Sequence, residues 1–96
     1  MKPIRIMIVC SFGIGTSLIL KMTLDEVLKA NHIKAETFTS DTDTALGQRF
    51  DCVLTSKDLA NIFGSKKQPV IIINNFINKD EVEAKIIPVI KQLSHA

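Results

Sequence analysis

The chain has 96 residues, a net charge of +2 and 46% hydrophobic side chains. This length suits one core, and we expect a single domain over residues 1–96. Basic and acidic residues are interspersed and neither Trp nor Tyr occurs, so the composition does not favour nucleic-acid binding. No apolar run approaches the roughly 18 residues that a membrane span needs, and Met1–Ile4 leads into a strand pattern rather than a signal peptide. We expect a cytoplasmic protein without direct membrane insertion.

The first part of the chain predicts a strand, a helix and a second strand. Residues 4–9 are a short apolar run that is typical of a buried strand. A helix is predicted over residues 18–31, with Thr16 or Ser17 as its N-cap. Residues 34–39 alternate polar and apolar side chains, which favours a less buried edge strand. The apolar stripe of the helix consists of Leu20, Leu24, Val27 and Leu28.

The middle of the chain predicts another strand and a short helix. Residues 40–48 are rich in Thr and Asp and predict a loop or a weak helix. Residues 51–55 are a short buried strand. Ser56 is expected to cap a short helix over residues 57–63, and Gly64 is placed as its C′ residue.

The last part predicts the clearest strand and a closing helix. Residues 69–73 are strongly apolar and β-branched, as a buried strand requires. Asn78 is the expected cap of the last helix, with Glu81 completing a variant of the capping box. The core stripe of this helix consists of Val82, Ile86, Val89, Ile90 and Leu93.

This alternation of apolar strands and helices predicts an α/β domain whose parallel sheet is covered on both faces. We expect a three-layer sandwich with a four-stranded parallel sheet in the order 2-1-3-4, a Rossmann-like and phosphatase-like arrangement. In such a sheet the switch point lies beside the first strand, at its carboxyl end. Cys10 falls at that position.

Cys10 is the candidate catalytic residue because of the loop that follows it. A thiol between a strand and the start of a helix faces backbone N–H groups and the positive end of the helix dipole. Such a site lowers the pKa of the thiol and can bind a phosphoryl group. The candidate phosphate-binding residues are Ser11, Phe12, Gly13, Ile14, Gly15, Thr16 and Ser17.

The other thiol and the two imidazoles lack such surroundings. Cys52 sits inside a predicted buried strand, so we interpret it as a core residue. His32 and His95 follow a helix end and a chain end, where side chains are usually solvated. Their spacing with the cysteines fits no zinc motif, and we expect no metal site and no cofactor.

Two other loop chemistries fit this segment less well. Gly13 and Gly15 resemble the start of a dinucleotide fingerprint, but Leu18 stands where its third glycine belongs, and no Gly-Lys-Ser/Thr of a phosphate-binding nucleotide loop occurs. Low-molecular-weight cysteine phosphatases and arsenate reductases also place Cys after the first strand. They have an Arg where this chain has Thr16, so the clamp on the transition state is missing.

A phosphatase also needs a general acid to protonate the leaving group. Asp41 and Asp43 are the nearest candidates along the chain, without special support. A nucleophile with an anion cradle but no Arg is suited to holding and passing on a phosphoryl group rather than hydrolysing a phosphate ester.

The chain resembles the enzyme IIB components of the bacterial sugar phosphotransferase system over its whole length. The loop from Cys10 to Leu18 is similar to the Cys-Ser-x-Gly-x-x-Thr-Ser-Leu of lactose/chitobiose-type IIB proteins, and galactitol- and ascorbate-type loops are also similar. Gly15 and the Lys21-Met22 pair favour the ascorbate type, from which the chain departs at Ser11.

The resemblance implies a cytoplasmic phosphotransferase. Cys10 would accept a phosphoryl group from a phosphohistidine of enzyme IIA and donate it to a sugar held by the membrane component IIC. The protein would then be peripheral at the inner face of the membrane through IIC. Phe12, Ile14 and Met22 are candidates for partner contacts or for ordinary packing. The alternatives are a phosphatase or arsenate-reductase-like enzyme, and a regulatory IIB-like module.

Overall fold

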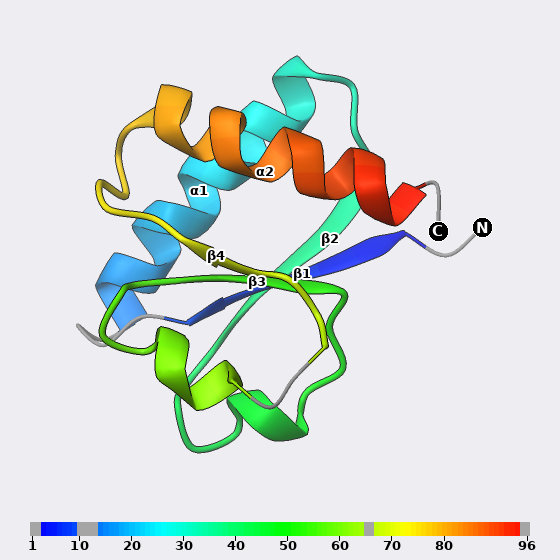
Figure 1. The fold of residues 1–96 in the computed structure, drawn as a ribbon. Helices are drawn as coiled ribbons and strands as arrows, with labels where there is room; N and C mark the ends of the chain where they lie inside the picture. Colours follow the sequence, from blue (N-terminus) through cyan, green and yellow to red (C-terminus); the bar gives the residue numbers. More distant parts are fainter. Residues whose placement is uncertain (1–2, 10–13, 65–66, 95–96) are drawn as a thin grey trace.

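The computed structural model describes residues 3–9, 14–64 and 67–94 of the chain. Figure 1 shows a single small α/β fold in which helices and strands alternate. The element order is β1 (Ile4–Val9), α1 (Ile14–Ala30), β2 (Ala35–Ser40), the 3₁₀ helix η1 (Ala45–Gly47), β3 (Cys52–Thr55), the 3₁₀ helix η2 (Ala60–Phe63), β4 (Val70–Ile72) and α2 (Lys79–Ser94).

The sheet confirms the predicted topology. Its four strands follow the order β2-β1-β3-β4, and every neighbouring pair is parallel. β1 is central, and residues Ile6 to Val9 are fully buried. β2 lies at an edge and is only partly buried, as its alternating sequence predicts.

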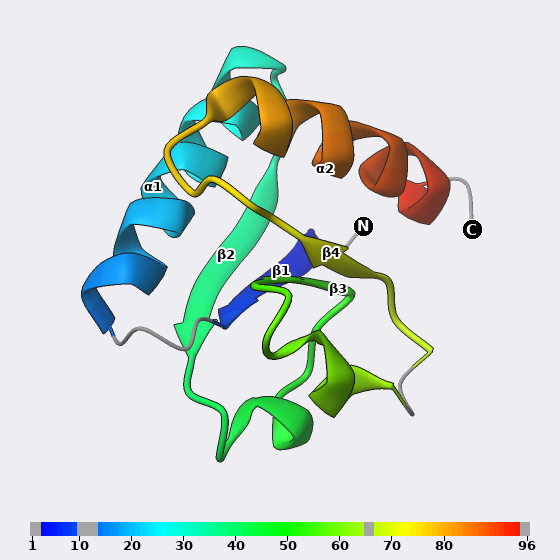
Figure 2. The ribbon, with the colours of Figure 1, turned by 60° about the vertical axis from the view of Figure 1, so that its left-hand side comes forward.

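The sheet separates two hydrophobic clusters. α1 and α2 cover one face, and η1 and η2 lie on the other (Figures 1 and 2). Because strand side chains alternate between faces, Ile8 and Leu54 pack beneath the α-helices, whereas Met7 and Val53 pack toward the 3₁₀ helices. The predicted three layers are present, with single 3₁₀ turns in place of α-helices in one outer layer.

α1 begins earlier than the sequence suggests. It starts at Ile14 rather than Leu18, so Thr16 and Ser17 lie in its first turn instead of at an N-cap. The predicted caps are therefore wrong. Glycine and hydroxyl side chains have low helix propensity, but packing onto the sheet outweighs it. Leu20 and Leu24 are fully buried, which confirms the predicted stripe.

The helix predicted after β3 is reduced to a single 3₁₀ turn. η2 covers only Ala60–Phe63, and Leu59 rather than Ser56 precedes it. Gly64 has φ −59°, so it is not a left-handed C′ residue. Phe63 anchors this segment by packing edge-on against Phe50 with ring centroids 5.9 Å apart.

α2 is capped as its sequence predicts. The Glu81 backbone N–H donates to Asn78 Oδ1 at 3.2 Å. The Glu81 carboxylate does not complete a capping box on Asn78; it binds the β4–α2 connection instead. The buried face of α2 contains Val82, Ile86 and Ile90, and Val89 and Leu93 are half-buried.

The end of α1 leads to a stability prediction. His32 has φ 56°, its N–H donates to the Lys29 carbonyl, and the Ile33 N–H donates to the Leu28 carbonyl. This Schellman arrangement usually has glycine at the left-handed position, because a Cβ is strained there. His32→Gly should therefore raise the free energy of unfolding by about 1 kcal/mol, as measured by urea denaturation. His32→Ala is the control and should not stabilise; equal midpoints for His32→Gly and wild type would contradict the interpretation.

Candidate functional site

The carboxyl ends of the strands define the edge of the sheet at which doubly wound domains bind ligands. Here Val9 pairs with Ser40 of β2 on one side and with Thr55 of β3 on the other. From this edge β1 leads to α1 on one face, and β3 leads to η2 on the opposite face (Figure 2). The switch point therefore lies between the carboxyl ends of β1 and β3.

The predicted site residues fall partly outside the described parts of the chain. Those outside are Cys10, Ser11, Phe12 and Gly13, and their roles stay predictions. Those inside are Ile14, Gly15, Thr16 and Ser17, which form the first turn of α1 rather than a loop. Ser17 is buried, with 4% of its surface exposed.

The start of α1 is electrostatically suited to an anion. The helix has 17 residues and no acidic side chain in its first turn. The first N–H groups of an α-helix have no acceptor within the helix and carry partial positive charge. The N-terminal end of α1 therefore presents donors beside the carboxyl end of β1.

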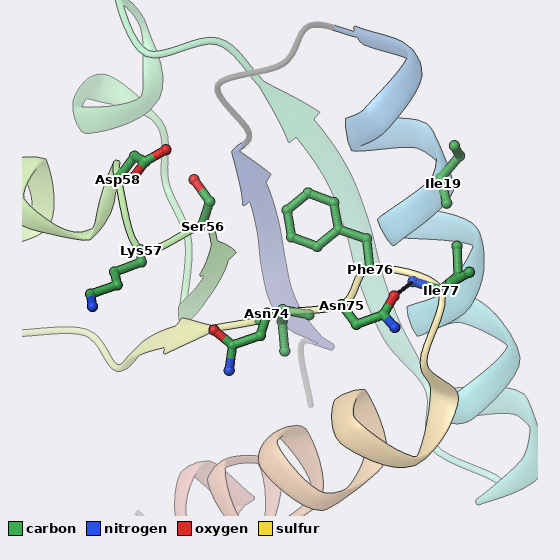
Figure 3. Close-up of a pocket in the computed structure, with 9 residues that line it drawn as sticks. Ile19, Ser56, Lys57, Asp58, Asn74, Asn75, Phe76 and Ile77 are labelled. Carbon is green, nitrogen blue, oxygen red and sulfur yellow. Dashed lines mark hydrogen bonds between the residues drawn. The ribbon is translucent and has the colours of Figure 1, made fainter.

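A pocket of about 450 Å³ opens at the same edge of the sheet. Its walls come from α1, from the segment after β3 and from the connection between β4 and α2 (Figure 3). The lining residues are Ile19, Ser56, Lys57, Asp58, Ile73, Asn74, Asn75, Phe76 and Ile77. The pocket combines an apolar side with polar groups, as small-ligand and partner sites do.

Ser56 differs most from its expected role. Its hydroxyl caps no helix; Oγ is buried and has no hydrogen-bond partner within the parts of the chain described here. The neighbouring Thr55 Oγ1 is in the same state. A buried hydroxyl without a partner costs about 1–3 kcal/mol, and of these two residues only Ser56 lines the pocket.

The β4–α2 connection is fixed by Glu81. Its carboxylate accepts hydrogen bonds from the backbone N–H groups of Asn74 at 2.7 Å and Asn75 at 2.9 Å. Lys85 Nζ donates to the same carboxylate and to the Ile72 carbonyl, both at 2.7 Å. The Asn74 amide and the Lys85 ammonium, together with the Asn75 amide, lower the pKa of Glu81 to about 2. One carboxylate thus holds one wall of the pocket.

Glu81 gives a prediction with a defined pH window. Its folded pKa lies below the ordinary 4.5, so its contribution is complete above pH 4.5 and is lost as pH falls toward 2. Glu81→Gln should lower the free energy of unfolding at pH 7 by about 2 kcal/mol. The difference in free energy of unfolding between the variant and wild type should be smaller at pH 3, as measured by urea titration.

Asp80→Asn removes the same charge from an exposed position of the same helix turn and is the control. It should cost less than Glu81→Gln at pH 7, because the helix dipole is its main partner. If the difference in free energy of unfolding between Glu81→Gln and wild type stays constant from pH 7 to pH 3, the carboxylate charge does not hold the β4–α2 connection.

Cys52 is confirmed as a core residue. It is fully buried in β3 under the α-helices, and desolvation, with a smaller effect of the Asp51 charge, raises the pKa of its thiol to about 12. A thiol in this state carries almost no thiolate at neutral pH. Cys52 is therefore unsuited to nucleophilic chemistry.

Asp41, a candidate general acid, accepts hydrogen bonds that favour its ionised form. Its carboxylate accepts hydrogen bonds from the Thr44 hydroxyl and the Thr44 backbone N–H, both at 2.8 Å. These bonds lower the pKa of Asp41 below its ordinary value. A general acid needs the opposite shift, so the phosphatase interpretation loses support.

Apolar side chains are exposed beside the site. Leu18, Ile19 and Met22 project from the first half of α1, and Met22 is 64% exposed. Ile77 of the β4–α2 connection is 70% exposed. The exposure of Met22 agrees with the sequence-based suggestion that it is available to a partner.

The two histidines, a metal site and a membrane-spanning helix are the remaining features to consider. His32 is exposed in the turn after α1, and His95 lies outside the described residues. Over residues 3–9, 14–64 and 67–94, no three His, Cys, Asp or Glu side chains are grouped so that they could hold a metal ion. Within the same ranges, no helix combines the length and the apolar character needed to cross a bilayer.

The fold and this edge define a small doubly wound α/β domain whose ligand site is expected at the β1/β3 switch point. Among solved structures, one similar domain is the lactose-specific IIB component domain of the phosphoenolpyruvate:carbohydrate phosphotransferase system from Streptococcus pneumoniae. The match covers 98% of this chain and 97% of that one, with a TM-score of 0.59 and 10% identity. At that identity the match establishes the fold. The comparison with curated proteins finds no match.

The sequence itself identifies the family. A family model described as "PTS system, Lactose/Cellobiose specific IIB subunit" matches residues 5–87. The chain therefore belongs to the lactose/cellobiose-specific IIB subunits of the phosphotransferase system. Such IIB domains are phosphoryl carriers in sugar uptake and work with IIA and IIC components.

The expected ascorbate type is not supported. The matching family is the lactose/cellobiose one, and the similar domain from Streptococcus pneumoniae is lactose-specific. The ascorbate preference relied on Gly15 and on the Lys21-Met22 pair. Gly15 lies in the first turn of α1, and Lys21 forms a local ion pair with Asp25 at 2.9 Å.

Proposed function

We propose that Cys10 is the phosphoryl acceptor of this IIB domain. Its thiolate attacks the phosphorus of a phosphohistidine on IIA, so an S–P bond forms as the N–P bond breaks. A hydroxyl of the sugar held by IIC then attacks the same phosphorus, and the S–P bond breaks. Family membership, together with the position of Cys10 directly after Val9 at the switch point, is the observation that carries the proposal.

The start of α1 supports this chemistry. The thiolate and the dianionic phosphoryl group both gain from the donors of a helix N-terminus that has no acidic residue in its first turn. We propose that residues 11–17, from Ser11 to Ser17, form the phosphate-binding segment. No metal or cofactor is needed for either transfer, because the phosphoryl group moves between nucleophiles that the proteins and the sugar supply.

The exposed apolar residues support docking of partners. Leu18, Ile19 and Met22 of α1 offer apolar contact area beside the N-terminal end of the helix, where IIA and IIC must in turn approach Cys10. We propose that residues 1–96 act as one IIB domain at the cytoplasmic face of the membrane, associated with it through IIC. Lactose and cellobiose, named by the family, are the sugars to test first.

A phosphoryl carrier and a phosphatase differ in how fast water hydrolyses their phosphorylated forms. Thr16 stands where phosphatases have Arg, and the lowered pKa of Asp41 is the opposite of the shift that a general acid needs. Isolated phosphoprotein should therefore release labelled phosphate slowly and discharge when IIC membranes and sugar are added. Rapid multiple turnover of p-nitrophenyl phosphate by the isolated wild type would replace the carrier function with a phosphatase function.

A further inference from the structure

Ser56 carries a hydrogen-bond donor that the folded chain leaves unused. The residue is 92% buried, since 8% of its surface is exposed, and Oγ has no partner within the described residues. It nevertheless lines the pocket, where Figure 3 shows it between Asp58 and Phe76. A buried donor without a partner at the ligand-binding edge of the sheet needs an explanation, and a bound group is one.

The strand register puts Ser56 beside the point where β1 ends. Val9 and Thr55 are partners in the parallel β1–β3 pair. Adjacent strands lie about 4.8 Å apart and consecutive Cα atoms about 3.8 Å apart, so chain connectivity alone keeps the Cα atoms of residues 10 and 56 within about 12 Å of each other. A side chain at position 56 is therefore a candidate contact of a phosphoryl group on residue 10.

The faces of the sheet distinguish Ser56 from Thr55. Leu54 packs beneath α1 and α2, and Val53 packs toward the 3₁₀ helices. By the alternation of strand side chains, Ser56 continues the α1 face and Thr55 the opposite one. Ser56 therefore shares its face with the N-terminal end of α1, and the two hydroxyls form a matched pair for experiment.

Among the polar and charged residues that line the pocket, Ser56 is the buried one. Lys57 and Asp58 also line the pocket, but both are exposed and carry opposite charges. Together they therefore favour neither an anionic nor a cationic ligand. The Asn75 side-chain oxygen accepts from the Ile77 N–H at 3.2 Å and is engaged in the connection itself. Ser56 therefore supplies a buried hydroxyl at this edge of the sheet.

We propose that the Ser56 hydroxyl donates a hydrogen bond to a phosphoryl oxygen of the group carried on Cys10. Ser56 is then a phosphoryl-binding residue contributed by β3, outside the segment of residues 11–17. The proposal rests on the proposed function of Cys10. It assigns to the β1/β3 switch point a donor from each side, the first turn of α1 and the end of β3.

The test uses inorganic phosphate as the probe and the whole chain as the protein. Alkylation of Cys10 by iodoacetamide is followed in rising phosphate concentrations for wild type, Ser56→Ala, Ser56→Thr and Thr55→Val. Ser56→Ala should raise the half-protecting phosphate concentration about tenfold, because a hydrogen bond to a charged group is lost. Ser56→Thr should restore protection, and Thr55→Val should match wild type. Both hydroxyl deletions should keep or raise the urea midpoint, because each removes a buried donor without a partner.

Each contrary outcome is decisive. Equal half-protecting concentrations for Ser56→Ala and wild type, or an equal loss in Thr55→Val, overturn the role of Ser56. A wild type that phosphate does not protect overturns it as well. Labelling of wild type by phosphorylated IIA, with the label located on Cys10, reports separately on the proposed function. The carrier function can therefore hold while the role of Ser56 fails.

Discussion

Cys10→Ser should abolish phosphoryl acceptance from phosphorylated IIA while leaving the fold intact. Removing the nucleophile of a covalent transfer typically costs about 10⁴-fold or more in rate, because a serine hydroxyl is scarcely ionised at neutral pH. The thiol follows the buried end of β1, and sulfur to oxygen is a small change in volume there. The measurement is transfer of labelled phosphate from IIA to IIB, with the urea midpoint of each variant as the check on folding.

Cys52→Ala is the matched control for this result. It removes the other thiol of the chain from a fully buried strand position and should lower stability by about 1 kcal/mol. Its labelling by phosphorylated IIA should equal that of wild type. Full labelling of Cys10→Ser, or loss of labelling in a folded Cys52→Ala, would move the acceptor away from Cys10.

The two thiols should also differ by about 10³-fold or more in alkylation rate at pH 7.5. Burial raises the pKa of Cys52 to about 12, so its thiolate becomes abundant only far above neutral pH. Cys10 should react at a pH well below the ordinary value of about 8.5, since the first turn of α1 stabilises its thiolate. Iodoacetamide labelling across pH 5–10, followed by peptide mapping, measures both profiles.

Each thiol can contradict this prediction independently. A Cys10 profile centred near the free-thiol value would remove the electrostatic argument that rests on the start of α1. Rapid alkylation of Cys52 in the folded protein would contradict the burial of β3. Addition of urea is the positive control, because unfolding should bring the Cys52 rate up to that of an ordinary thiol.

Hydrophobic patterning was sufficient to predict the sheet. The runs at residues 4–9 and 51–55 are apolar over short lengths, and only a sheet covered on both faces buries such strands completely. The alternation in residues 34–39 predicted the half-buried edge strand β2 in the same way. The right-handed crossover rule allows the strand order 2-1-3-4 that the structure confirms, so local pattern and topology led to the same switch point.

Local propensity was misleading where tertiary packing decides the outcome. The glycine and hydroxyl residues before Leu18 predicted a loop, yet α1 begins at Ile14 because it packs along the sheet. Ser56 fits an N-cap by its type and by the residues after it. Among the residues that the structure describes, its hydroxyl instead has no hydrogen-bond partner at the end of β3. A sequence pattern cannot distinguish a serine that caps a helix from one whose buried hydroxyl has no partner in the fold.

The pocket could not be predicted because its walls are distant along the chain. Ile19, Ser56 and Phe76 meet only after α1 and α2 pack on the same face of the sheet (Figure 3). The role of Glu81 was hidden for the same reason, since its expected partner was the cap residue and its observed partners are the Asn74 and Asn75 amides. Long-range hydrogen bonds of this kind leave no periodic signal.

The most direct test is to locate the phosphate on the phosphorylated protein. IIB is incubated with labelled phosphoenolpyruvate, the general phosphotransferase proteins and IIA, and the modified residue is identified by peptide mapping under conditions that preserve phosphothiols. We expect one phosphoryl group per chain, on Cys10, that is discharged when IIC and sugar are added. Phosphate on His32 or His95, or none on IIB when IIA is fully phosphorylated, would contradict it.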